Sequence, residues 1–336
     1  MGNMPANTPS ASKRKLGWLL VVGSVVFVLM SAVYWQRWNI IDDIKLYHYQ
    51  APAQVAQLST ATSMTPFARH IFYVNHPQIQ NKTDFNQACT SYGEQTIILG
   101  CYHPVQSGIF VYAINDPRLN GVEQVTAAHE MLHAAYDRLS SAERRNVNAM
   151  LMDYYQHDLH DQRLLDTIAS YKKTEPNDVV NEMHSVFGTE ASNLPAPLEA
   201  YYKRYFTDRS TVVAFANSYQ AEFTSRQQQV AADDQRLKAI KAEIDSNNHT
   251  LSVQRASLQA LLAQMNAERS SGDIAGYNAN VPTYNSGVDS YNQLVDETSQ
   301  LIASYNQLIA DRNELAIEVN QLNHAINSQP STLQTQ

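Results

Sequence analysis

The chain has 336 residues, which is long enough for two domains, and it holds 24 Lys and Arg against 32 Asp and Glu, a formal net charge of −8 at pH 7. This charge, and the lack of a Lys- and Arg-rich run with interleaved aromatic residues beyond the N-terminus, exclude nucleic acid as an expected partner.

The first predicted element is a transmembrane helix. Residues 16–35 read LGWLLVVGSVVFVLMSAVYW and carry no charge, which matches the length that a helix needs to cross a bilayer core of roughly 30 Å. Lys13, Arg14 and Lys15 precede this stretch, so we expect residues 1–15 in the cytoplasm and the bulk of the chain outside. The sequence therefore predicts a single-pass membrane protein. A cleaved signal peptide and a buried core helix stay open as alternatives.

Residues 51–215 form the predicted globular domain. Residues 55–64 favour a helix, whereas 68–75, 95–103 and 108–115 are rich in β-branched and aromatic residues, as strands are. A long helix begins near Val122, and further helical stretches follow to about Phe206. A small sheet followed by helices predicts an α+β domain.

The two cysteines, Cys89 and Cys101, fall within this domain on the predicted external side, where disulfides persist. A bridge between them would stabilise the fold by ~3 kcal/mol. Two unpaired core thiols are the alternative.

The motif with the clearest chemistry is TAAHEMLHAAYD, residues 126–137. On a helix, His129 and His133 share one face and can bind one metal ion, while Glu130 lies beside the ion and can take a proton from water. Histidines in so apolar a stretch are costly unless they are satisfied, and a metal satisfies them. The alternative is a helix with chance histidines.

A catalytic zinc site needs a third protein ligand. Residues 176–188, PNDVVNEMHSVFG, place Glu182 among apolar side chains, where a carboxylate needs a cation or another partner. His184 is the rival third ligand.

These motifs resemble the gluzincin clan of zinc metallopeptidases, of which thermolysin is a member. The family's H-E-x-x-H-A-x-x-D corresponds to residues 129–137, and its N-E-x-x-S-D corresponds to residues 181–186, except that Val186 replaces the aspartate. The resemblance implies a zincin-like fold, Zn²⁺ held by His129, His133 and Glu182, and Glu130 as the catalytic base. It also implies a peptide-binding edge strand, for which residues 108–115 are positioned.

The aspartate that Val186 replaces orients a ligand histidine in the family, so other residues must support the site here. Asp137 and Asp153 are the possible substitutes, and Asn181 is a further candidate for supporting the site. The family's oxyanion-stabilising histidine has no clear match, and Tyr201, Tyr202 and Arg204 are the candidates for that role.

The resulting prediction is a membrane-anchored, outward-facing zinc metallopeptidase acting on a peptide or protein substrate, at a bacterial cell surface. Two alternatives stay open. One is a cell-surface scaffold whose coiled coil binds a protein partner, with the zincin-like domain in a binding role. The other is a hydrolase of a non-peptide amide.

Residues 216–328 predict a coiled coil, and residues 329–336 a flexible tail. Leucines recur every seven residues from Leu294 to Leu322, and a second apolar seam runs from Leu237 to Met265. The turn-like sequence between the seams favours an antiparallel hairpin within one chain, with arms of roughly 60 Å. A parallel oligomeric coiled coil is the alternative.

Overall fold

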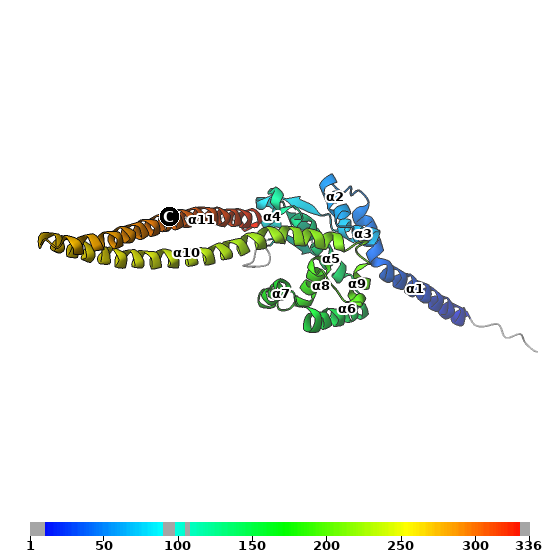
Figure 1. The fold of residues 1–336 in the computed structure, drawn as a ribbon. Helices are drawn as coiled ribbons and strands as arrows, with labels where there is room; N and C mark the ends of the chain where they lie inside the picture. Colours follow the sequence, from blue (N-terminus) through cyan, green and yellow to red (C-terminus); the bar gives the residue numbers. More distant parts are fainter. Residues whose placement is uncertain (1–10, 90–97, 105–107, 330–336) are drawn as a thin grey trace, which may run out of the picture. The chain divides into compact units, whose positions relative to one another are not determined.

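The computed structural model describes residues 11–89, 98–104 and 108–329 (Figure 1). The predicted N-terminal tail lies mostly outside these residues, and so does the predicted tail at 329–336 beyond residue 329. The chain divides into two compact units. The first comprises residues 1–95, 99–113 and 123–213, and the second comprises residues 96–98, 114–122 and 214–336.

The first unit is mostly helical, which corrects the predicted α+β class. Its strands are only three to five residues long, and helices make up nearly all the rest of its regular structure. The helices in its N-terminal part, before residue 90, are α1 (Ala11–Leu46), α2 (Ala53–Ala61), α3 (Pro66–Val74) and α4 (Lys82–Cys89). After the sheet follow α5 (Val122–Asp137), α6 (Ser141–Asp153), a π-helical turn (Tyr154–Asp158), α7 (Gln162–Thr174), α8 (Val179–Glu190) and α9 (Ala196–Tyr202).

The sheet of this unit has three strands in the order β1-β3-β2. β1 (Gln78–Gln80) pairs parallel with β3 (Gly108–Tyr112), and β2 (Gly100–His103) pairs antiparallel with β3. β3 is therefore the central strand. The prediction that residues 108–115 supply a peptide-binding edge is wrong, because both edges of β3 are already paired, and β1 and β2 are the two edge strands of the described sheet instead.

The predicted strand at residues 68–75 is also wrong, because this segment forms α3. Pro66 occupies the first turn, and the Thr65 side chain accepts a hydrogen bond from the amide of Ala68, which caps the helix. Ala68, Ile71 and Phe72 are buried, and that spacing is helical. The local capping and the core contacts thus outweigh the β propensity of the aromatic and branched residues.

The predicted membrane anchor is contradicted too. Within the part of the chain that the structure describes, no helix is long and apolar enough to cross a membrane. The helix does not end near residue 35 as predicted, but continues to Leu46 through Asp42, Asp43 and Lys45. The side chains of residues 16, 17, 34 and 35, at the ends of the predicted anchor, lie outside the described residues. The single-pass, cell-surface location that depended on the anchor is corrected with it.

The C-terminal end of α1 is joined to the end of α5 by a buried ion pair. Asp42 is 2% exposed and accepts hydrogen bonds from both terminal nitrogens of Arg138, at 2.6 and 2.8 Å. His70 Nε2 lies 3.0 Å from the same carboxylate. Burial by itself would raise the pKa of Asp42, but Arg138 and His70 more than offset it and lower that pKa.

The predicted disulfide is confirmed. Cys89, at the end of α4, is bonded to Cys101 in β2, with their Cα atoms 6.0 Å apart. The bridge joins α4 to the edge strand of the sheet. Both cysteines of the chain are used in it.

The second unit contains a hairpin of two long helices, α10 (Ser210–Ser270), which starts at the end of the first unit, and α11 (Ile274–Ile326). Ion pairs between the helices show that they run antiparallel: Arg226 contacts Glu318 at 2.6 Å, and Arg312 contacts Asp234 at 2.9 Å. Gly272, with φ of +78°, lies in the short turn between them.

Candidate metal centre

Helix α5 carries the HExxH residues in a nearly dry environment. Met131 and Leu132 between the histidines are fully buried, as are the alanine pairs before His129 and after His133. A helix that is apolar on all sides is stable only inside a core, so the polar side chains on it need partners there. His133 and Glu130 are also buried, at 8% and 6% exposure.

Helix α8 brings Glu182 to the histidines. Every residue of α8 from 182 to 189 is buried. A Cβ at Gly188 would lie 2.5 Å from Leu132 of α5 and 2.7 Å from Tyr202, so only glycine allows this close approach of α8. Arg209 donates hydrogen bonds to the carbonyls of Phe187 and Ala191 at the end of α8, which satisfies its last turn.

The three predicted ligands converge on one point. His129 Nε2 lies 3.0 Å from His133 Nε2. Glu182 Oε2 lies 3.5 Å from His129 Nε2, and Glu182 Oε1 lies 3.3 Å from His133 Nε2. Side chains from two helices, about fifty positions apart in sequence, thus form a compact triangle, in which each histidine is closest to a different oxygen of the Glu182 carboxylate.

This triangle fits a zinc ion. Zinc bonds of ~2.0–2.1 Å in a tetrahedron place neighbouring ligand atoms about 3.3–3.4 Å apart. The two histidine nitrogens are 3.0 Å apart, and their nearest carboxylate oxygens, one from each side of the Glu182 carboxylate, lie at 3.3 and 3.5 Å, so the side chains are spaced close to that value. Glu182 Oε2 is buried and has no hydrogen-bond partner within the described residues, which is costly unless a cation satisfies it. Three protein ligands leave one tetrahedral position for water or substrate.

Electrostatics also favour an anionic Glu182. Burial by itself would raise the pKa of this carboxyl, but the neighbouring His133 and His129 more than offset burial and lower that pKa below its usual value. Glu182 also lies in the first turn of α8, where the helix dipole favours negative charge. The carboxylate is therefore in the form that binds a cation.

Glu130 faces the edge strand of the sheet. A Cβ at Gly100, in β2, would lie 2.7 Å from Glu130 Oε1 and 2.5 Å from the Thr126 methyl group. The absence of a side chain at residue 100 therefore makes room for the Glu130 carboxylate. Glu130 therefore lies against a face of β2 at Gly100.

Tyr171 on α7 is a residue of the site that the sequence did not identify. Burial and the negative charges of Glu182, Glu190 and Glu130 raise its pKa well above its usual value, so its hydroxyl stays protonated. Its hydroxyl helps to lower the pKa of Glu182. A lone tyrosine in ASYKKT carries no sequence signal, because its proximity depends on the packing of α7 against α8.

His184, the rival third ligand, points elsewhere. Its Nε2 lies 2.9 Å from the Tyr201 hydroxyl, and the Tyr202 hydroxyl donates to its backbone carbonyl. Burial, with the charges of His133 and His129, lowers the pKa of His184 to about 3, so the ring is neutral.

The same contacts remove the predicted oxyanion-stabilising candidates from the site. Tyr201 and Tyr202 are engaged with His184, and Arg204 pairs with Glu143 at 3.0 Å.

The predicted supporting residues are less well placed. Asp137, one turn after His133, contacts Tyr102 of β2, and its ion-pair partner is Arg144 at 3.9 Å. Asn181 has a buried amide oxygen without a hydrogen-bond partner among the described residues. Asp137 lies four residues after His133, and Asn181 directly precedes Glu182. In the described contacts, neither is hydrogen-bonded to a ligand histidine.

A second group of metal-ligand types, Cys89, Cys101 and His103, is structural. Both sulfur atoms are used in the disulfide, and His103 Nε2 lies 2.8 Å from the carbonyl oxygen of Ala88. The disulfide leaves no thiolate there to bind a metal.

Comparison with known proteins adds no relative. No protein-family model matches the sequence, and no curated protein or solved structure shows significant similarity to it.

Proposed function

We propose that this protein is a zinc-dependent peptidase, with His129, His133 and Glu182 as the zinc ligands and Glu130 as the general base. The observation that carries this proposal is the triangle of ligand side chains: the two histidine nitrogens lie 3.0 Å apart, and each lies 3.3 or 3.5 Å from an oxygen of the Glu182 carboxylate, close to the spacing of neighbouring ligand atoms around zinc. The unsatisfied oxygen of Glu182 supports it, because a cation is the partner that this oxygen lacks.

Zinc, when bound, would polarise the scissile carbonyl and lower the pKa of the attacking water. Glu130 takes the proton from this water as the new C–O bond forms, and delivers it to the amine nitrogen as the C–N bond breaks. The burial of Glu130 suits this role, since a dry site strengthens each electrostatic interaction within it.

Tyr171 supplies a neutral hydrogen-bond donor in the same site. Its hydroxyl carries its proton at neutral pH, as that of any tyrosine does, so it can donate to the negative charge that develops on the carbonyl oxygen. An extended peptide substrate would add to the edge of β2, whose first residue, Gly100, lies against Glu130.

The test uses Glu130→Gln in the full chain, with Glu123→Gln on the same face of α5 as the matched control. Zinc content is measured by elemental analysis, and turnover with a peptide library. We expect both variants to retain zinc, because neither side chain is a ligand, and only Glu130→Gln to lose cleavage, by roughly 10²-fold or more.

Two results would contradict the proposal. A wild-type chain that binds no zinc would remove the metal centre. A chain that binds zinc but cleaves no peptide would leave the domain in a partner-binding role.

A further inference from the structure

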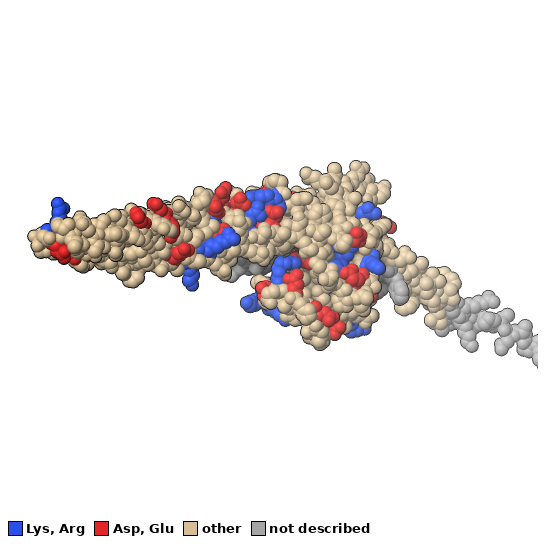
Figure 2. Space-filling view, in the orientation of Figure 1, with Lys and Arg blue, Asp and Glu red and all other residues tan. Residues whose placement is uncertain are grey.

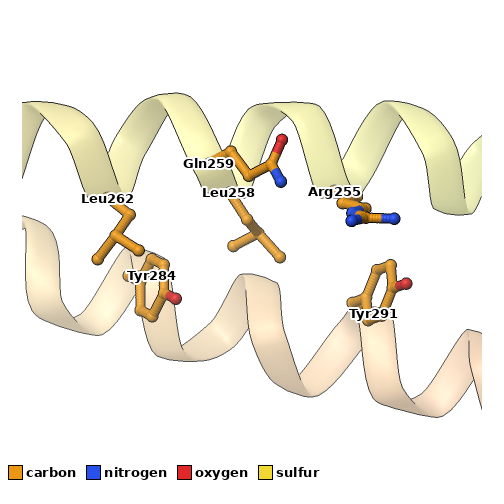
Figure 3. A pocket seen from close by; sticks show the side chains of 6 residues that line it. All are labelled: Arg255, Leu258, Gln259, Leu262, Tyr284 and Tyr291. Carbon is orange, nitrogen blue, oxygen red and sulfur yellow. The ribbon is translucent and has the colours of Figure 1, made fainter.

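The hairpin offers a recess and a surface of mixed charge, but no group of metal ligands among its described residues. A shallow recess of about 220 Å³ lies between α10 and α11, and apolar, aromatic and polar side chains line it, chiefly Leu258, Leu262, Tyr284, Tyr291 and Arg255 (Figure 3). Acidic and basic side chains are interspersed on the visible face of the hairpin (Figure 2). The group with more specific chemistry lies beside the sheet of the first unit.

Cys89, Cys101 and His103 form that group, at the disulfide that joins α4 to β2. One potential ligand atom from each residue lies within 4.8 Å of those of the other two. His103 Nε2 is 3.5 Å from Cys101 Sγ. Zinc bonds of about 2.0–2.1 Å to nitrogen and about 2.3 Å to sulfur place tetrahedral neighbours roughly 3.6 Å apart. The imidazole and this sulfur are thus spaced as two ligands of one zinc ion.

Contacts other than the disulfide also hold these side chains together. The whole of β2, from Gly100 to His103, is paired with β3. Phe85 holds α4 against β3, since it is 1% exposed and its ring centroid lies 5.7 Å from that of Tyr112. His103 is buried, and its Nε2 lies 2.8 Å from the Ala88 carbonyl oxygen in the last turn of α4. We therefore expect the three side chains to stay close together when the disulfide is opened.

We propose that the disulfide is the oxidised state of a redox-controlled zinc site, in which the reduced chain binds Zn²⁺ through Cys89, Cys101 and His103. Two thiolates and an imidazole favour zinc over Mg²⁺ and Ca²⁺, which prefer oxygen ligands. The ion joins α4 to β2 in the reduced chain, as the disulfide does in the oxidised chain. The site is independent of the candidate centre on α5 and α8, because the two share no ligand.

The redox step requires a dithiol as reductant. The dithiol transfers two electrons and two protons to the Cys89–Cys101 bond, so that it becomes a disulfide itself and the two cysteines become thiols. Binding of Zn²⁺ then releases both thiol protons, and the two thiolates neutralise the charge of the ion.

His103 changes its partner in the same step. Its Nε2 binds the ion in exchange for the hydrogen bond to Ala88, and the ring carries its hydrogen on Nδ1. Water completes the tetrahedron, as at catalytic zinc sites with two cysteines and one histidine.

The experiment measures metal binding by the full chain before and after reduction with a water-soluble phosphine, which is oxidised to its oxide with oxygen from water. Co²⁺ is the probe, because thiolate ligands give a sulfur-to-cobalt charge-transfer absorption, whereas the candidate centre has no sulfur ligand. Zinc affinity is then measured by displacement of cobalt, and helix content by circular dichroism. We expect the absorption, with one additional ion per chain, only after reduction. Failure of the candidate centre would leave this absorption unchanged.

His103→Gln tests the imidazole as a ligand. The glutamine amide retains an N–H group that can donate to the Ala88 carbonyl, so the variant preserves the structural role of His103 and removes the ligand. The matched control is His160→Gln, at an exposed histidine of the same unit. We expect His103→Gln to weaken zinc binding by the reduced chain at least about tenfold, and His160→Gln to leave it unchanged.

Three outcomes would overturn the proposal. One is a reduced wild-type chain without the charge-transfer absorption, and the second is equal zinc affinity in reduced His103→Gln and His160→Gln. The third is loss of helix content on reduction alone, because the ligands must stay in place without the disulfide. If His103→Gln loses helix content, Cys89→Ser is compared with the reduced wild type instead, since both lack the disulfide. The same tenfold loss is then expected, and equal affinity contradicts the site.

Discussion

Replacing Gly100 by alanine should disturb the candidate base without touching a zinc ligand. Gly100 lies in edge strand β2, and the added Cβ would stand 2.7 Å from Glu130 Oε1, 2.9 Å from Glu130 Cγ and 2.5 Å from the Thr126 methyl group. Ordinary contacts of this kind begin at 3.4 Å, so the Glu130 carboxylate must move by about 0.7 Å or the strand must shift. Helix α5 and the sheet are both closely packed at this point, so neither can move freely to accommodate the added methyl group.

The size of the effect follows from this displacement of about 0.7 Å, the difference between 3.4 Å and 2.7 Å. Overpacking a core by one methyl group costs about 1–3 kcal/mol of unfolding free energy. A displacement near 1 Å at a reacting group lowers turnover by ~10²-fold, so a shift of about 0.7 Å should lower kcat/KM by roughly 10- to 100-fold. Zinc affinity should stay near that of the wild type, because the three atoms nearest the new methyl group belong to Thr126 and Glu130 and not to a ligand.

The assay combines thermal unfolding, zinc content and peptide cleavage for Gly100→Ala and a matched control. Gly108→Ala overpacks the same sheet, since its Cβ would lie 2.6 Å from the ring of Phe110, and its three nearest atoms all belong to that ring and none to Glu130. We expect both variants to lose stability and only Gly100→Ala to lose turnover per folded molecule. Equal turnover in the two variants would refute the placement of Glu130 against β2.

Three further changes test the site and its support. Glu182→Ala should lower zinc affinity, measured by metal titration, by about 10-fold or more. Loss of a residue that only supports a ligand already costs roughly 10-fold, and loss of a ligand should cost at least as much. His184→Ala should keep zinc, because the ring contacts Tyr201 rather than the ligand triangle, and zinc loss from His184→Ala alone would reverse the ligand assignment. Asp42→Asn should lower the unfolding free energy at pH 7 by roughly 1–3 kcal/mol, since it removes the buried anion that the half-buried Arg138 and His70 contact. Because the pKa of Asp42 is lowered from 3.8, this stabilisation is complete above that pH and is lost as the pH falls through the lower folded-state value. The difference between wild type and Asp42→Asn in denaturant melts should therefore shrink below pH 4, and a constant difference would contradict the assignment.

The sequence alone determined the residues of the candidate centre, because helical spacing is a local property. His129 and His133 lie four apart and must share a helix face, and Glu182 stood out as a carboxylate in an apolar run. The hairpin seam was readable for the same reason, since a heptad pattern needs no knowledge of distant residues. The structure brings the three side chains within 3.5 Å of one another.

Tertiary structure decided what depends on contacts between distant segments. Residues 68–75 have strand-like composition, but the Thr65 cap and a buried helical face made them α3. The order of the strands put β3 in the centre of the sheet and β2 at its edge, which no alternation pattern encodes. Tyr171 and Gly100 entered the site only through the packing of α7 on α8 and of β2 beside α5. Local patterns specify which face of an element is apolar, whereas the partner of that face is selected by the whole core.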